Sequence, residues 1–275
     1  MIFNKIKINN LLILSIVIIF YIILFVKNNN QENFNIKPLS SVINKFFVIT
    51  LNETDEGKKR MNKLKKNEIL GKYITKFNGI YGKKYDYNNE IKHGIIKKTW
   101  DYGLWNNKKS QIVEMSDGEI GCCLSHYYLW KKIVDEKIPI TMILEDDCDK
   151  LYPNFENIVL KLIKIVPKDW DIFLIGFWLH KGNDGKKINE HIYKVKNFAL
   201  THCYIITYKG AKKLLNSLPI NMPVDSWLSS QSNNLNIYRH NLAKNKNTYP
   251  SGLLIRQKKI LGSQIQHTNQ FIRNK

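Results

Sequence analysis

Residues 138–147 have the sequence Ile-Pro-Ile-Thr-Met-Ile-Leu-Glu-Asp-Asp, in which an apolar run ends in three carboxylates. The apolar part predicts a buried β-strand. Carboxylates crowded at a strand end are costly unless a positive charge neutralises them, and oxygen ligands suit Mg²⁺ or Mn²⁺. Ligands of open α/β sheets also collect outside the carboxyl ends of strands. Glu145, Asp146 and Asp147 therefore predict a cation-assisted anion site, the alternative being a polar strand end with helix-capping acids.

Strands alternate with helices on both sides of this stretch. Further strands are expected at residues 45–51, 73–77, 171–176 and 203–207, and helices near 55–64, 120–136, 155–166 and from 210. Ser116 and Glu119 form a capping-box pattern before the second of these helices. Such alternation predicts an α/β fold with a mainly parallel sheet covered on both faces. Residues 81–113 show weak periodicity and are expected to form a long loop region.

The N-terminal part contains an apolar run at residues 8–26, close to the length of a bilayer-spanning helix. No small-residue cleavage pattern follows it, which favours an uncleaved signal anchor over a signal peptide. The expected organisation is an anchor at 1–27, a polar stalk at 28–45 and a folded domain at 46–275. Lysines flank the run with a slight excess before it, which predicts a cytosolic N-terminus and a lumenal or external domain.

The composition fits a folded protein with an anionic partner. The chain has 275 residues, 44% of them hydrophobic, and a net charge of +20. Asp225 is the last acidic residue, and the chain after it is basic or neutral. This distribution suits an anionic ligand, a phosphate-rich surface or an anionic membrane, the alternative being a solvated basic face. No nucleic-acid partner is expected, because no helix-turn-helix, zinc-finger or RNA-binding signature is present.

The four cysteines lack the CxxC spacing of a zinc site. Cys122 and Cys203 stand in apolar contexts and are expected to be small buried residues rather than metal ligands. Their even number leaves a disulfide open, but nothing in the sequence selects a pairing.

Several motifs together resemble glycosyltransferase family 25, which includes bacterial lipooligosaccharide galactosyltransferases and collagen hydroxylysine galactosyltransferases. The most specific pieces are Gly-Glu-Ile-Gly-Cys-Cys-Leu-Ser-His at 118–126 and Leu-Glu-Asp-Asp at 144–147. Weaker matches are Phe-Val-Ile-Thr-Leu-Asn at 47–52, Asp-Trp-Asp at 169–171, Gly-Ala-Lys-Lys-Leu-Leu at 210–215 and Pro-Val-Asp at 223–225. The resemblance covers roughly residues 46–265.

This resemblance implies a GT-A-like, Rossmann-type nucleotide-sugar-binding domain. It implies transfer of a hexose, galactose before glucose, from a UDP-sugar with inversion at the anomeric carbon and assistance from Mn²⁺ or Mg²⁺. The implied acceptor is a glycan, a lipid-linked saccharide or hydroxylysine in a collagen-like chain.

The resemblance also implies roles for individual acidic residues. Asp147 is the expected direct metal ligand, while Glu145 or Asp146 would contact the ribose or a metal-bound water, with Glu145 as a further metal ligand. Inversion needs a general base for the acceptor hydroxyl, and Asp225 is the candidate.

Five other residues are candidates for the sugar-nucleotide site. Asn52 ends the first strand motif, and Arg60 is the one clear match to two arginines that the family usually carries there. His126 is either a hydrogen-bonding residue of the site or a core histidine. Asp171 is either a site carboxylate or a cap at the start of a strand. His267 is a candidate for a late metal or phosphate contact.

Two alternatives to an active transferase stay open. One is an inactive protein of the same fold that acts in binding or as a scaffold. The other is a membrane-tethered polyanion-binding protein, which would leave the acidic cluster without an explanation.

Overall fold

The structure is a computed structural model that describes residues 37–105, 108–179, 185–241 and 254–257. The expected membrane segment and His267 lie outside these residues. In the described part of the chain, no helix has both the length and the apolar character needed to cross a membrane. The chain divides into two units with a boundary after Pro38, and all elements below belong to the second.

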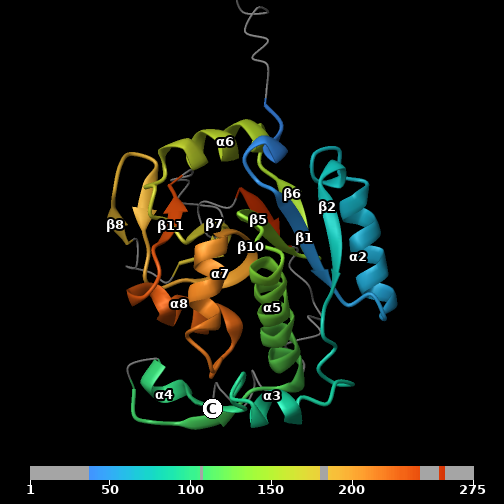
Figure 1. Cartoon of the computed structure of the whole chain (residues 1–275), viewed down its shortest axis with the longest axis vertical. Coiled ribbons are helices and arrows are strands. Elements are labelled where there is room, and N and C mark those ends of the chain that lie inside the picture. Colours follow the sequence, from blue (N-terminus) through green and yellow to red (C-terminus); the bar gives the residue numbers. More distant parts are fainter. Residues whose placement is uncertain (1–36, 106–107, 180–184, 242–253, 258–275) are drawn as a thin grey trace, which may run out of the picture. The chain divides into compact units, whose positions relative to one another are not determined.

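An eight-stranded sheet forms the centre of the second unit (Figure 1). Its spatial order is β2 (Ile74–Asn78), β1 (Lys45–Thr50), β5 (Ile140–Glu145), β10 (Ala199–Thr207), β7 (Ile172–Trp178), β11 (Ile237–His240), β9 (Ile192–Lys194) and β8 (Lys186–Lys187). Strands β2, β1 and β5 are parallel, as are β7 and β11. Strand β10 is antiparallel to both neighbours, and β8 and β9 form an antiparallel pair.

The sheet is therefore mainly parallel but mixed, because β10 and β9 run opposite to the other strands. Parallel neighbours need a crossover connection, usually a helix, whereas antiparallel strands do not. The chain runs from β7 through β8 and β9 to β10 without an intervening helix among the described residues. This route allows β10 to return in the opposite direction between β5 and β7.

Helices cover both faces of the sheet (Figure 1). One apolar core joins the sheet to α5 (Asp117–Asp135), α7 (Tyr208–Leu215) and α8 (Val224–Ser230). The other joins it to α2 (Asp55–Lys65) and α6 (Phe155–Ile165). Neighbouring residues of β5 enter different cores, Ile143 the first and Leu144 the second. This burial on two sides explains the continuous apolar run.

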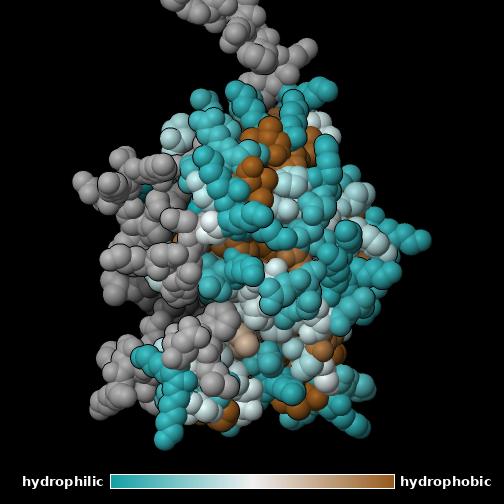
Figure 2. Space-filling model, turned by 90° about the vertical axis from the view of Figure 1, so that its left-hand side faces the viewer, coloured by the Kyte–Doolittle hydropathy of each residue, from teal (hydrophilic) through white to brown (hydrophobic). Residues whose placement is uncertain are grey.

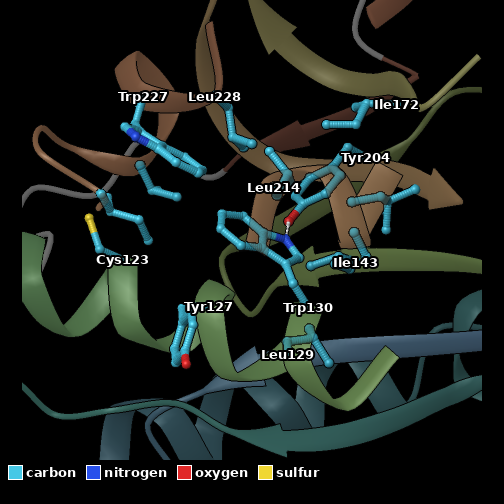
Figure 3. Close-up of a cluster of buried hydrophobic side chains, with 14 of the residues drawn as sticks. Cys123, Tyr127, Leu129, Trp130, Ile143, Ile172, Tyr204, Leu214, Trp227 and Leu228 are labelled. Carbon is cyan, nitrogen blue, oxygen red and sulfur yellow. Dashed lines mark hydrogen bonds between the residues drawn. The ribbon is translucent and has the colours of Figure 1, made fainter. Parts of the chain in front are cut away.

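Helix α5 begins with the predicted capping box. The Ser116 hydroxyl accepts a hydrogen bond from the Glu119 backbone N–H, and the Glu119 carboxylate accepts one from the Ser116 N–H. Farther along, Trp130 stacks on Trp227 of α8 with ring centroids 5.7 Å apart. The Trp130 indole also donates a hydrogen bond of 2.9 Å to the Tyr204 hydroxyl of β10 (Figure 3). The long central helix is thus fixed against both the sheet and α8.

Several short elements complete the fold, some of them where the sequence predicted a loop or a stalk. Within the expected loop region are α3 (Asn88–Lys92), β3 (Thr99–Asp101), α4 (Tyr102–Trp105) and β4 (Ile112–Glu114). The other short elements are η1 (Leu39–Ser41), η2 (Leu70–Lys72), β6 (Cys148–Leu151), η3 (Gln231–Asn233) and β12 (Ile255–Gln257). Leu39 and Ile43 are completely buried, so the folded unit begins before residue 46.

The coloured surface in Figure 2 is mostly hydrophilic, with hydrophobic areas between the polar side chains. Among the described residues, the larger exposed hydrophobic side chains are those of Ile91, Ile112, Tyr152, Ile165 and Ile188. They are separated along the chain, and single exposed apolar side chains are normal on folded domains.

Candidate active site

A pocket opens at the edge of the sheet where the parallel strands β1 and β5 end. It has about 740 Å³ of empty space, part of which is open to solvent. Its wall comes from the turn after β1, the segment after β2, the first half of α5 and the acidic cluster. The lining residues used below are Arg60, Ile80, Gly82, Gly118, Cys122, Ser125, His126, Glu145, Asp146 and Asp147.

The three carboxylates of the acidic cluster have different partners. Glu145 Oε1 accepts a 3.0 Å hydrogen bond from the Thr201 hydroxyl and lies 3.4 Å from His126 Nε2. Asp146 Oδ1 accepts a hydrogen bond of 3.3 Å from the Arg60 guanidinium. Asp147 Oδ2 accepts one of 2.6 Å from Gln257, whereas its buried Oδ1 has no hydrogen-bond partner among the described residues.

These surroundings separate the pKa values of the cluster. Burial raises the pKa of Asp147 to about 8, and the nearby charge of Glu145 acts in the same direction. Burial also raises the pKa of Asp146, although Thr50 and Arg60 act against it. For Glu145, burial opposes ionisation, but the contacts with His126 and Thr201 lower its pKa overall. Glu145 thus ionises more readily than Asp147, and a cation beside Asp147 would favour ionisation of its carboxyl.

The cluster fits a hard divalent cation. Asp147 presents a buried carboxylate oxygen without a partner, and the charged Glu145 is its neighbour on the same strand end. Carboxylate oxygens are the ligands that Mg²⁺ and Mn²⁺ prefer. Asp147, then Glu145, are the residues that would hold such an ion.

A second set of ligand atoms shares the same pocket. The ligand atoms of Cys122, His126 and Glu145 lie within 4.8 Å of one another. Cys122 is only partly buried and lines the pocket, so the expectation of a small buried residue is wrong. Cys123, Cys148 and Cys203 are buried, and all four cysteines are free thiols.

His126 belongs to the core and to the pocket at once. Its side chain is completely buried, and its ring stacks on Tyr204 at a centroid distance of 5.7 Å. Its Nδ1 is hydrogen-bonded to the Tyr204 hydroxyl at 2.8 Å, while its Nε2 faces Glu145. His126 is therefore a core histidine that also lines the pocket, and its role as a hydrogen-bonding residue of the site stays a prediction.

Gly121 and Ser125 of the 118–126 motif hold the wall of the pocket in place. A Cβ atom on Gly121 would lie 2.5 Å from the Ile80 carbonyl oxygen and 2.7 Å from the Gly82 nitrogen. The Ser125 hydroxyl accepts a 2.7 Å hydrogen bond from the Ile80 N–H and donates one to the Gly121 carbonyl. Only glycine at 121 allows α5 to approach the segment after β2 this closely.

The two candidates after β1 have different positions. Arg60 lines the pocket and is held by Glu56 at 3.0 Å and by Asp146. Helix α2, which carries Arg60, follows the N-cap residue Thr54 and agrees with the helix expected near residues 55–64. Asn52 lies in the turn before this helix and is not a lining residue of the pocket.

Asp171 does not join the site. It directly precedes β7, which runs parallel to β5, so it lies at the edge of the sheet opposite the acidic cluster. Its buried carboxylate pairs with Lys213 at 2.5 Å and accepts a hydrogen bond from the Asn236 N–H. The structure thus favours the alternative, a residue that fixes the start of a strand.

Asp225 lies in the first turn of α8, with a neighbouring negative charge on Glu145. Its Oδ2 accepts a 3.1 Å hydrogen bond from the Leu200 N–H, and its Oδ1 accepts one of 2.7 Å from the Ser226 N–H. Burial raises the pKa of Asp225, against the lowering that positive charges of the basic C-terminal part would favour. Arg239 does not act in this way, since it is buried with its guanidinium over the Tyr193 ring.

Residues 43–228 match the sequence model of glycosyltransferase family 25, described as an LPS biosynthesis protein. The chain belongs to glycosyltransferase family 25. It is 28% identical over 193 residues to procollagen galactosyltransferase 1-B of Xenopus laevis, which covers 66% of this chain and 30% of that protein. It is 30% identical over 148 residues to human procollagen galactosyltransferase 2, covering 50% of this chain and 22% of that protein.

A bovine protein named "Probable inactive glycosyltransferase 25 family member 3" is 24% identical over 202 residues, covering 70% of this chain and 32% of that protein. The chain thus spans less than a third of the length of these family 25 relatives. Among solved structures, A197 from STIV aligns with a TM-score of 0.33 and 11% identity over 71% of this chain and 80% of that chain. This similarity is too distant to bear on fold or function.

Sequence reasoning missed three residues that contact the family 25 motifs in space. Thr201 and Tyr204 come from β10 and bind Glu145 and His126, and Gln257 comes from β12 and binds Asp147. Leu200 has a φ of +64° where the pairing register of β10 with β7 is irregular. No local pattern in the sequence marks these contacts, because they depend on how distant strands pair.

Proposed function

We propose that this chain is a GT-A-like galactosyltransferase that uses a UDP-linked donor, with inversion and with help from Mn²⁺ or Mg²⁺. The acceptor would be a glycan, a lipid-linked saccharide or hydroxylysine in a collagen-like chain. Membership of family 25 and the names of the relatives support the sugar and the reaction class. The observation that carries the proposal is the unpartnered, buried Asp147 oxygen beside Glu145 in an open pocket.

The pocket offers groups suited to a nucleoside diphosphate. A cation held by Asp147 and Glu145 would act as a Lewis acid on the leaving diphosphate. Gly118, in the first turn of the 19-residue helix α5, lines the pocket, and the amino end of a helix favours phosphate. Arg60 adds a fixed positive charge, oriented by Asp146. These groups together would bind the donor and hold its diphosphate in one orientation.

Asp225 is the proposed base that removes the proton from the acceptor hydroxyl. A base works best when its pKa lies near the working pH, and burial raises the pKa of this carboxyl toward that range. Backbone hydrogen bonds from Leu200 and Ser226 hold the carboxylate in a fixed orientation, as a base that serves one acceptor hydroxyl requires.

The test is a screen of the purified full-length chain against a panel of UDP-sugars with Mn²⁺, scored by UDP release. UDP-galactose should be hydrolysed fastest, and both EDTA and the Asp147→Asn variant should abolish release. Donor binding without any turnover across the panel would identify an inactive family member instead. Salt-sensitive binding of unrelated polyanions without donor binding would support the polyanion-binding alternative.

We also propose that residues 8–26 anchor the chain in a membrane, with the N-terminus cytosolic and the transferase domain lumenal or external. The apolar length and the missing cleavage pattern of the sequence support this. The full chain expressed in cells should resist carbonate extraction and keep its original N-terminal residues. A mature N-terminus near Asn28 would instead reveal a cleaved signal peptide.

A further inference from the structure

The Cys122–His126–Glu145 group combines a thiol, an imidazole and a carboxylate at one point of the pocket wall. Cys122 and His126 are four residues apart on α5, so they lie on the same face of the helix. Glu145 reaches them from the end of β5, and the three ligand atoms lie within 4.8 Å of one another. Imidazole and thiolate are ligands for zinc, whereas Mg²⁺ and Mn²⁺ prefer oxygen alone.

His126 supplies an independent observation that points to a ligand. Its side chain is completely buried, and its Nε2 has no hydrogen-bond partner among the described residues. This nitrogen nevertheless faces Glu145 Oε1 at 3.4 Å. A lone pair and a carboxylate at this distance repel each other, so a proton or a cation must lie between them.

The contact of His126 with Tyr204 is compatible with a cation at Nε2. The Trp130 indole donates to the Tyr204 hydroxyl (Figure 3). The same hydroxyl is hydrogen-bonded to His126 Nδ1 at 2.8 Å. If Nδ1 carries the proton and donates it to the Tyr204 oxygen, Nε2 is left with its lone pair toward Glu145. A histidine whose other nitrogen is held in this way is the usual arrangement around a bound metal.

We propose that Cys122, His126 and Glu145 form a zinc site, separate in its donor set from the hard-cation site at Asp147. Three protein ligands leave the fourth position of a tetrahedral ion open to the pocket. This zinc binding does not depend on the proposed transferase function. One consequence of the zinc site does rest on that function. Because Glu145 belongs to both donor sets, zinc should compete with Mn²⁺ and inhibit transfer.

Cobalt(II), a spectroscopic substitute for zinc, tests the site directly in the metal-free full-length chain. The expected result is a thiolate-to-cobalt charge-transfer band that zinc removes. Cys122→Ser should lose the band, and the matched variant Cys123→Ser, at the buried neighbour, should keep it. No band in the unaltered chain, or a band that persists in Cys122→Ser, would overturn the proposal and leave a proton between His126 and Glu145.

A measurement on the unaltered chain guards against a variant that fails to fold, and two further variants test the support of the site. In the unaltered chain, zinc should slow alkylation of Cys122, the one cysteine of the four that is not buried. Equal alkylation rates with and without zinc would contradict the site. Tyr204→Phe should weaken zinc binding by about 10–100-fold through the lost support of His126, while Asp147→Asn should leave it within a few-fold.

The two proposals fail in different ways. A cobalt band in a chain that transfers no sugar would refute the proposed function alone. Transfer that depends on Mn²⁺ in a chain without a cobalt band would refute the zinc site alone.

Discussion

Replacing Asp147 by asparagine should stabilise the metal-free protein while abolishing metal-assisted transfer. Asparagine keeps the shape of the side chain and an oxygen that can accept the hydrogen bond from Gln257. It removes a carboxyl whose pKa is about 8 in the folded protein against an ordinary value of 3.8. Without a cation, the folded wild type therefore loses stability at neutral pH, because the unfolded chain ionises Asp147 and the folded protein does not.

The size and sign of the effect follow from this pKa. Because the folded-state value lies above the unfolded one, the contribution to stability is complete below about pH 4 and is lost as the pH rises toward about 8. At roughly 1.4 kcal/mol per pKa unit, the upper limit at pH 7 is about 4 kcal/mol. Water in the open pocket and coupling to Glu145 reduce this upper limit, so we expect the variant to be more stable than the wild type by about 1–2 kcal/mol. This corresponds to a rise in unfolding temperature of about 2–8 °C.

Thermal unfolding of Asp147→Asn and wild type, in EDTA at pH 5 and at pH 8, measures the difference. The advantage of the variant should be small at pH 5 and largest at pH 8. Mn²⁺ at about 100 times its dissociation constant should stabilise only the wild type, by about 2.7 kcal/mol. The same stability difference at both pH values, or a variant less stable than wild type at pH 8, would refute the reasoning. Asp147 would then not be a buried carboxyl that destabilises the metal-free protein and binds a cation.

Three other substitutions test the remaining parts of the site. Asp225→Asn should lower the transfer rate by about 10²–10⁴-fold, while the donor dissociation constant stays within a few-fold. If calorimetry shows that donor binding is lost instead, Asp225 belongs to the nucleotide site. Arg60→Met should weaken UDP binding by roughly tenfold or more, through the loss of hydrogen bonds from a charged group; unchanged binding would restrict Arg60 to a structural role. Gly121→Ala should lower the stability by about 1–3 kcal/mol and weaken UDP binding, because the alanine Cβ would push the segment after β2 away. Denaturant unfolding identical to that of the wild type would contradict the close approach of α5 to this segment.

The elements around the acidic cluster could be predicted from the sequence because their signals are local. The apolar run of β5 ends at Glu145 as expected, and the capping box at Ser116 starts α5. Helix α6, at Phe155–Ile165, agrees with the helix expected near residues 155–166. Each of these features depends on a few consecutive residues, whose side chains determine the local backbone conformation.

The pairing of β10 and the contacts it carries could not be predicted in this way. The sequence indicated a strand at residues 203–207, whereas β10 begins at Ala199. The missing part contains Leu200 in the left-handed region, a conformation that a non-glycine residue adopts only under outside constraint. That constraint comes from α8, beyond the reach of any local pattern.

Asp225 connects this strained segment to the acidic cluster. Its carboxylate accepts the hydrogen bond from the Leu200 N–H, and the next residue, Thr201, donates its hydroxyl to Glu145. Loss of Asp225 could therefore lower activity by releasing the backbone at Leu200, without any role as a base. Thr201→Val separates the two causes, because it removes the contact with Glu145 and leaves Asp225 intact. If Asp225 is the base, its asparagine variant should lose the pH dependence of the rate, whereas Thr201→Val should keep that dependence at a lower rate. Equal pH profiles in both variants would assign Asp225 a positioning role only.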